Sequence, residues 1–260
     1  MSLRQSLIKI ECQSVLEFKP PTIIYRNKHA LIIGINKYPR DPLNYCINDA
    51  KDLKIALEQI GFNVILGIDC NFRQFLHLID EFSTKIHHDD LALFYYAAHG
   101  RESRGENFFF PSDYDYDYRD DEHDYIVNHT VKVTYILKKL NDVKLRVIIC
   151  LFDCCRSLVR TRSTNAHAGL SLMGPTANSF IVYACAPGRA VRDETRNNRN
   201  GCFMEHLLQH IKMPKTDIEA IMKRVAYGVV SATNNSQQPQ RVTSLTGEVF
   251  LVNHDNQSKI

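Results

Sequence analysis

The sequence has 260 residues, enough for one large α/β domain or two small ones with a sizeable core. Its composition, 44% hydrophobic and 23% charged, is typical of a soluble globular chain, and its net charge of +3 comes from scattered residues of both signs, which does not indicate nucleic-acid binding. No apolar run approaches the ~18 residues of a membrane helix, and the first residues lack the apolar core of a signal peptide, so we expect no membrane insertion or export.

The eight cysteines are dispersed along the chain and include no CxxC pair that would indicate a zinc site. This pattern is typical of reduced thiols in the cytosol, most of them buried as small apolar side chains. We therefore expect a cytoplasmic protein without a metal site.

Residues 1–27 form a lead-in that we expect to pack on the domain without forming a domain of its own. After it, apolar runs that predict buried strands alternate with segments in which apolar residues recur at a helical period. The predicted strands cover 29–35, 62–68, 91–98, 145–152, 179–185 and 248–252, and the predicted helices cover 49–60, 71–86, 130–140, 202–211 and 216–232.

This alternation predicts an α/β fold with a mostly parallel central sheet and helices on both faces. The last helix is expected to open with a capping box formed by Thr216 and Glu219. Two polar stretches, 157–178 and 187–200, are predicted to be long loops, and the first of them is expected to be exposed.

Reactive side chains follow two of the predicted strands. One strand stops at Asp153, Cys154 and Cys155, and another ends in His99 and Gly100. Sites in open α/β sheets lie just beyond the carboxyl ends of the strands. A thiol is a useful nucleophile only as the thiolate, so a cysteine delivered beside a histidine indicates nucleophilic catalysis, with a buried structural thiol as the alternative.

A set of motifs runs in order through most of the chain. They are HALIIGINKY at 29–38, the helix start at Asp49, LALFYYAAHG at 91–100, FFFPSD at 108–113, LFDCCRS at 151–157, YACAPGRAVRD at 183–193 and GCFMEHLL at 201–208. In these motifs the chain resembles the caspase-like cysteine peptidases, and within them the paracaspase and metacaspase branches, paracaspases most of all.

The resemblance implies the caspase–hemoglobinase fold and one peptidase domain at 28–253, followed by a tail at 254–260. Within that domain it implies a large-subunit-like part (28–156), a linker loop (157–178) and a small-subunit-like part (179–253).

Carried over position by position, the resemblance implies that Cys155 is the nucleophile and His99 its proton acceptor. Cys155, and not Cys154, stands two residues after the aspartate and directly before Arg156. The backbone N–H groups of Gly100 and Cys155 would form the oxyanion hole. Such an enzyme hydrolyses peptide bonds through an acyl-enzyme and requires no cofactor.

The resemblance also predicts that the substrate pocket carries negative charge. Asp153 replaces the glutamine of the caspase motif, Asp193 aligns with a caspase arginine, and Asp49 aligns with an acidic position of paracaspases. Three converging carboxylates favour a substrate arginine or lysine, and arginine above lysine because it can bond bidentately. Arg26 is the one residue that favours a substrate aspartate, since it aligns with a caspase pocket arginine.

Several alternatives stay open. An aspartate-specific caspase and a catalytically silent scaffold of the same fold are the rival functions. The alternative to a pocket role for Asp49 is a carboxylate that stabilises the N-terminus of a helix. The alternative for Asp153 is a structural ion pair with Arg156. Arg160 and Arg162 suit self-cleavage, or belong to a plain solvated loop.

Two further features carry alternatives of their own. The acidic run at 113–124 reads as a solvated loop, with calcium binding as the alternative. The strand predicted at 248–252 is a candidate edge for pairing with a second copy into a homodimer.

Overall fold

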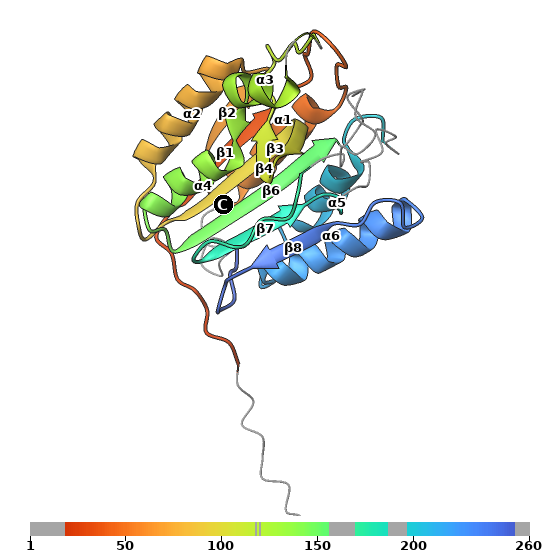
Figure 1. The fold of residues 1–260 in the computed structure, drawn as a ribbon. Helices are drawn as coiled ribbons and strands as arrows, with labels where there is room; N and C mark the ends of the chain where they lie inside the picture. The colour runs from red at the N-terminus through yellow and green to blue at the C-terminus, as the bar shows by residue number, and fades with distance from the viewer. Residues whose placement is uncertain (1–18, 118, 120, 156–169, 187–196, 253–260) are drawn as a thin grey trace, which may run out of the picture.

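The computed structural model describes residues 19–252 except 118, 120, 156–169 and 187–196, and at Cys155 it describes only the backbone. The central sheet has the strand order β2-β1-β3-β6-β7-β8 (Figure 1). All neighbours in it are parallel except β7 and β8, which are antiparallel. The strands are β1 (Lys28–Gly34), β2 (Asn63–Ile68), β3 (Leu91–Ser103), β4 (Glu106–Phe109), β5 (Val131–Lys132), β6 (Val147–Cys155), β7 (Ser179–Tyr183) and β8 (Gln240–Thr243).

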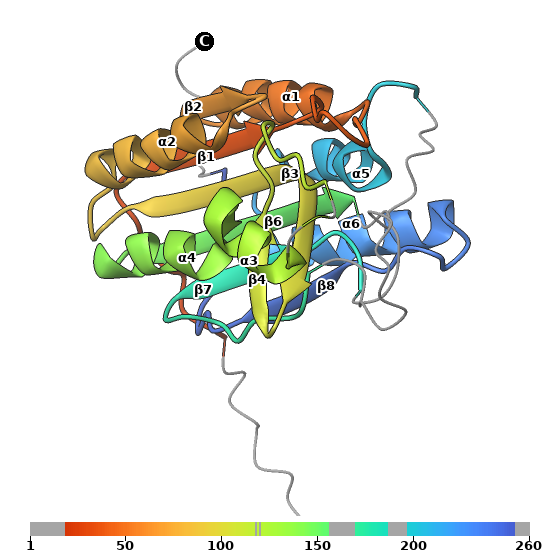
Figure 2. The same cartoon turned by 45° about the horizontal axis from the view of Figure 1, so that its top comes forward.

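Helices cover both faces of the sheet, as the alternating pattern predicts (Figures 1 and 2). One face carries α1, α5 and α6, and the other carries α2, α3 and α4. The helices other than α3 pack apolar stripes inward, which is why their period was visible in the sequence. α3 buries only Ile126, so it carries no such period and was not predicted. The helices are α1 (Cys46–Gln59), α2 (Phe72–Lys85), α3 (Glu122–His129), α4 (Val133–Asp142), α5 (Cys202–His210) and α6 (Ile218–Ala232).

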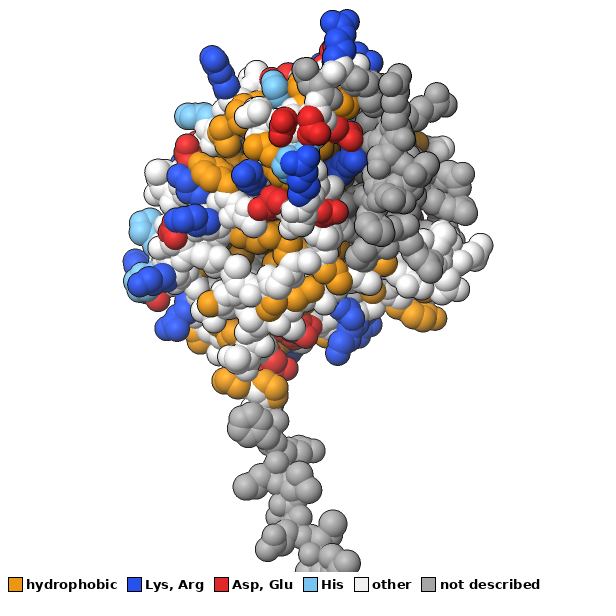
Figure 3. Space-filling model, viewed as in Figure 1, with side chains coloured by type: hydrophobic (Ala, Val, Ile, Leu, Met, Phe, Trp, Pro, Cys, Tyr) orange, Lys and Arg blue, Asp and Glu red, His pale blue; other side chains and the backbone are white. Residues whose placement is uncertain are grey.

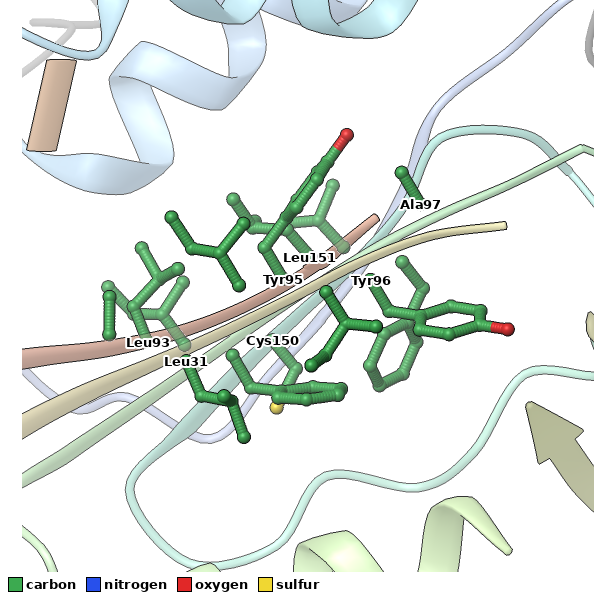
Figure 4. Close-up of a cluster of buried hydrophobic side chains, with 14 of the residues drawn as sticks. Leu31, Leu93, Tyr95, Tyr96, Ala97, Cys150 and Leu151 are labelled. Atoms are coloured by element: carbon green, nitrogen blue, oxygen red, sulfur yellow. The ribbon is translucent and has the colours of Figure 1, made fainter. Parts of the chain in front are cut away.

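The core lies on both sides of the central strands because successive side chains of a strand point to opposite faces. Tyr95 and Leu151 project to one side, and Tyr96 and Cys150 project to the other (Figure 4). All four are at most 1% exposed. This two-sided burial is the reason that β3 and β6 appear in the sequence as unbroken apolar runs.

β3 is longer than its apolar run and changes partners along its length. It pairs with β6 as far as His99, and from Gly100 to Ser103 it pairs with the antiparallel strand β4. The residues beyond His99 are only half-buried and polar, so hydrophobicity alone predicted a strand that stops too early. β6 likewise continues through Asp153 to Cys155.

α1 begins at Cys46, earlier than predicted, and its start packs directly against the end of β1. A Cβ atom at Gly34 would lie 2.5 Å from the carbonyl oxygen of Cys46, which no side chain tolerates. The glycine therefore lets the helix approach the strand end closely, and Asp49 follows in the first turn.

The predicted strand at 248–252 is wrong. Glu248 and Phe250 form only isolated bridges, with Thr22 and Asp217, and the strand at the edge beyond β7 is β8. β8 is short and its side chains alternate between half-buried and exposed, so it lacks the apolar run that predicts a strand. Pairing of two copies along this edge would therefore involve β8.

The capping box predicted for the last helix is also wrong. Asp217 is the N-cap of α6, and its carboxylate accepts the backbone N–H of Glu219. The hydroxyl of Thr216 instead donates to the carbonyl of Pro214. The cap is one residue later than predicted, and Asp217 serves as well as threonine in this role.

Two polar stretches contain more structure than their composition indicates. The described part of the lead-in, 19–27, packs on the domain, and its Ile23 N–H donates to Glu248 O at 2.9 Å. In the predicted exposed loop at 157–178, Leu170 is only 2% exposed, so the expectation of exposure is wrong at that residue. None of the helices in the described ranges is long and apolar enough to cross a membrane.

Candidate active site

The candidate nucleophile and base are paired at the carboxyl end of the sheet. The parallel register of β3 and β6 sets His99 directly opposite Cys155. Neighbouring strands lie about 4.8 Å apart, so the two backbones are one strand spacing from each other. The sequence suggested that both residues lie just beyond the strand ends. In the structure, His99 lies within β3 and Cys155 within β6. The sheet register therefore brings together an imidazole and a cysteine that are far apart in the chain.

His99 is 4% exposed and held from several sides. Its Nε2 lies 2.7 Å from the backbone carbonyl oxygen of Asp41, and its ring packs on Tyr38 with centroids 4.6 Å apart. Its backbone N–H donates to the Tyr38 hydroxyl, and the Tyr96 hydroxyl lies 2.7 Å from its carbonyl oxygen. A carbonyl oxygen only accepts, so Nε2 carries the proton and Nδ1 is the unprotonated nitrogen of the neutral ring.

The loop that carries Asp41 is held at its ends and near its middle. Asn36 accepts the backbone N–H of Ile47 and donates to Asn44 O, so its side chain joins the two ends of the loop. Near the middle, Nε of Arg40 donates to Asp115 at 2.7 Å. These tethers fix the carbonyl that orients His99. This role has no signal in the sequence, because a residue of any type could supply the backbone carbonyl.

Gly100 occupies a crowded position next to His99. A Cβ atom there would lie 3.1 Å from Sγ of Cys154 and 3.3 Å from the carbonyl oxygen of Phe108. Only glycine fits without displacing these neighbours. The structure thus gives a packing reason for the glycine and places Cys154, whose side chain is buried, under it.

Asp153 and Asp49 are buried carboxylates on the face of the sheet covered by α1. Asp153 is 5% exposed and its Oδ2 accepts a 3.2 Å hydrogen bond from the Tyr95 hydroxyl. Asp49 is 3% exposed and accepts from the backbone N–H of Gly201 at 3.0 Å. Within the described part of the chain, neither carboxylate forms an ion pair with a lysine or arginine.

Burial without a cation changes the protonation of both acids. It raises the pKa of Asp153 to about 7, against which the Tyr95 hydrogen bond acts weakly. Burial also raises the pKa of Asp49, and the nearby Asp153 carboxylate adds to this, while hydrogen bonds from Asn200 and Gly201 oppose it. Two neighbouring carboxylates that are costly to ionise form a site in which an incoming cation would be strongly favoured.

Of the remaining candidate residues, the structure describes only Arg26. Asp193, Arg160 and Arg162 are outside the described residues. Arg26 precedes β1, so it lies at the amino end of the sheet, opposite to His99 and Cys155. Its backbone N–H bonds to Asp89 O, and it lines a pocket with two histidines there. Arg26 therefore does not contribute to a pocket around Asp153, contrary to the one alignment that favoured an aspartate substrate.

The described residues of the acidic run form separate pairs. Asp115 pairs with Arg40, Glu122 with Arg101, and Asp121 caps α3. Figure 3 shows basic and acidic side chains interleaved on the face where α3 lies. Among the described residues, no group of three or more histidine, cysteine or carboxylate side chains is arranged to hold a metal ion.

Sequence reasoning missed four residues that shape this site. Tyr38, Asp41 and Tyr95 contact the candidate base or a pocket carboxylate, and Asn200 bonds to Asp49. Tyr95 sits in an apolar run, where it reads as core. The others are loop residues whose partners are distant in sequence, so only the tertiary structure identifies them.

The chain is similar to a known protein family and to a solved structure. The caspase-domain model of a peptidase family matches residues 27–250. Among solved structures, the crystal structure of the Drosophila initiator caspase Dronc is similar with a TM-score of 0.66 at 14% identity, covering 92% of this chain and 88% of that one. No curated protein matches. The family match over most of the chain, together with the shared fold, shows that this protein belongs to the caspase-domain family of cysteine peptidases.

Proposed function

We propose that the protein is a cysteine endopeptidase that cleaves after arginine or lysine, with Cys155 as nucleophile and His99 as base. The observation that carries the specificity is the buried pair Asp49 and Asp153, which has no cationic partner among the described residues. A guanidinium placed between them would restore their charge and bond bidentately, which a substrate aspartate would not do. Asp193 would add a third carboxylate.

In the proposed reaction, Nδ1 of His99 accepts the thiol proton of Cys155. The sulfur forms a bond to the scissile carbonyl carbon, and the carbonyl electron pair moves onto oxygen, where the N–H groups of Gly100 and Cys155 stabilise it. Collapse of this intermediate breaks the C–N bond, and His99 returns the proton to the leaving amine. Water then hydrolyses the thioester and restores the thiol.

The hydrogen bond to Asp41 supports this role for His99. It holds the ring in the tautomer with Nδ1 unprotonated, and it stabilises the imidazolium formed after proton transfer, because Nε2–H then donates to the carbonyl more strongly. The backbone carbonyl of Asp41 would thus orient the histidine and stabilise its charged form, as a carboxylate does in other catalytic triads.

Two other functions remain as alternatives. The similar fold of an initiator caspase favours an aspartate-directed enzyme, although the position of Arg26 at the opposite end of the sheet removes its main support. A silent scaffold of the same fold is the second alternative, and the paired His99 and Cys155 argue against it.

Paired fluorogenic peptides that differ only in arginine, lysine or aspartate at the cleaved position test the proposal. We expect turnover of the arginine and lysine peptides by wild type and none by Cys155→Ala. Turnover of the aspartate peptide alone would refute the basic specificity. Failure of an arginyl reactive-ketone probe to label Cys155, with or without calcium or dimer-promoting salt, would instead favour the scaffold.

A further inference from the structure

A set of polar contacts joins the first turns of α1 to the residues that precede α5. It combines one ion pair with hydrogen bonds from side chains and backbone, and we refer to it as the latch. The latch consists of Asn48, Asp49 and Asp52 on α1 and of Arg199, Asn200 and Gly201 before α5.

The ion pair of the latch is bidentate. Nε of Arg199 lies 2.7 Å from Oδ2 of Asp52, and Nη2 lies 2.6 Å from Oδ1. The amide of Asn200 donates to the same carboxylate at 2.9 Å. The hydrogen bonds from Arg199 lower the pKa of Asp52, so this carboxylate stays charged. Such geometry fixes the direction of both planar groups.

The latch also engages Asp49, one turn earlier on α1. The side chain of Asn48 donates to Arg199 O at 3.1 Å, and this places the following backbone so that Gly201 N–H reaches Oδ1 of Asp49 at 3.0 Å. Asn200 bonds to Asp49 as well. The donors that orient the buried Asp49 carboxylate are therefore held in place by Arg199 and Asp52.

Holding the fold together does not account for this arrangement. The side chain of Arg199 is 59% exposed and that of Asp52 is 16% exposed. An ion pair with a solvent-exposed arginine contributes little to stability. α5 and α6 also bury large apolar side chains, which provide the packing energy on this face.

We propose that Asp52 and Arg199 are a positioning pair for the substrate pocket, which orients the Asp49 carboxylate toward a basic side chain of the substrate. Neither residue touches the substrate in this proposal. The inference rests on the proposed function, in which Asp49 forms one wall of the pocket. It adds that recognition of a basic residue depends on a contact one helical turn away from the pocket.

The proposal has a consequence for pH dependence. Besides Asn200 and Gly201, the groups that face Asp49 are Asp153 on β6, Tyr95 on β3 and Asp52 on its own helix. The hydrogen bonds of the latch favour ionised Asp49, so loosening it raises the pKa of Asp49. A cationic substrate would then bind less tightly, and the loss would be larger at low pH.

The test measures kcat and KM for an arginyl fluorogenic peptide at about pH 6 and about pH 8, on either side of the pKa of about 7 of the neighbouring Asp153. The variants are Arg199→Gln, Arg199→Lys and Asp52→Asn. Lys54→Gln is the matched control, because Lys54 pairs with Glu58 on the same helix away from the latch. Thermal unfolding of each variant verifies that it folds.

We expect Arg199→Gln and Asp52→Asn to raise KM about tenfold with kcat changed less than about twofold, because binding and not chemistry is affected. The rise should be larger at the lower pH. Arg199→Lys keeps the charge without the bidentate fork, so it should recover part of the loss. Lys54→Gln should behave as wild type.

An unchanged KM in folded Arg199→Gln, or an equal change in Lys54→Gln, would overturn the positioning role while arginine cleavage by wild type still stands. If wild type fails to cleave the arginyl peptide at all, the proposed function itself is wrong. If Arg199→Gln does not fold, Asn48→Ala replaces it, since this change removes the bond from the half-buried Asn48 side chain to Arg199 O. An unchanged KM in Asn48→Ala would also count against the proposal.

Discussion

The imidazole of His99 donates its Nε2 hydrogen to the backbone carbonyl oxygen of Asp41, 2.7 Å away. Asp41 has φ of 53°, a left-handed conformation that is uncommon for a residue with a side chain. The carbonyl therefore points at the ring only while the loop keeps this conformation. The orientation of the candidate base depends on the contacts that hold the loop.

The Arg40–Asp115 pair is the first of these contacts to test. Asp115→Asn removes the charge that holds Arg40 at 2.7 Å, so the loop carrying Asp41 gains freedom. We expect kcat for an arginyl peptide to fall roughly threefold to tenfold through misorientation of His99, with little change in KM. Asp117→Asn is the control, since Asp117 pairs with exposed Arg119 in the same loop. Equal losses in both variants would contradict the assignment.

Gly100→Ala should impair catalysis strongly. The added Cβ would lie 3.1 Å from Sγ of Cys154 and 3.3 Å from Phe108 O, so the backbone of Gly100 must move. If its N–H forms the oxyanion hole, kcat should fall about 100-fold or more. Gly174→Ala is a matched control, because nothing lies within 4 Å of its Cβ position. Near-normal kcat in folded Gly100→Ala would exclude this N–H from catalysis.

Asp153→Asn should make the protein more stable at high pH. Burial raises the pKa of Asp153 from 3.8 to about 7, so the folded state holds the proton more tightly than the unfolded state. The contribution of Asp153 to the free energy of unfolding is fully present below its pKa in the unfolded state. It is lost as the pH rises from about 4 to about 7. The free energy of unfolding should therefore shift by roughly 2 kcal/mol in favour of the variant between about pH 5 and about pH 8.

Urea unfolding of wild type and Asp153→Asn at both pH values measures this shift. Asp49 acts in the same direction in wild type, because its pKa is also raised by burial and by Asp153. A difference in stability that does not change with pH would mean that Asp153 is already ionised in the folded protein. The same variant should lose cleavage of the arginyl peptide.

Tyr95→Phe should weaken substrate binding without affecting the chemistry. The Tyr95 hydroxyl donates to Asp153 at 3.2 Å and opposes the rise in its pKa. Without this donor Asp153 holds its proton to higher pH, so we expect KM for the arginyl peptide to rise about fivefold with kcat unchanged. Tyr135→Phe, which removes an exposed hydroxyl from Asp80, serves as control. A fall in kcat alone would instead link Tyr95 to His99.

The sequence by itself determined the α/β architecture and the two candidate catalytic positions. Strands buried on both faces appear as unbroken apolar runs, and amphipathic helices appear as a period, because each depends on local residue order. Asp153 to Cys155 and His99 were identifiable because charge and thiols interrupt such runs. Short edge elements such as β8 were missed, since half-exposed strands carry no apolar run.

Only the tertiary structure decided which distant residues serve those positions. The register of β3 on β6 pairs His99 with Cys155, a carbonyl of a loop fixes the imidazole, and Arg199 reaches back to Asp52 on α1. The tertiary structure also places Arg26 at the amino end of the sheet, away from the pocket to which the alignment assigned it. These contacts join segments that are distant in the sequence and are stabilised by tertiary packing. They therefore leave no local pattern in the sequence.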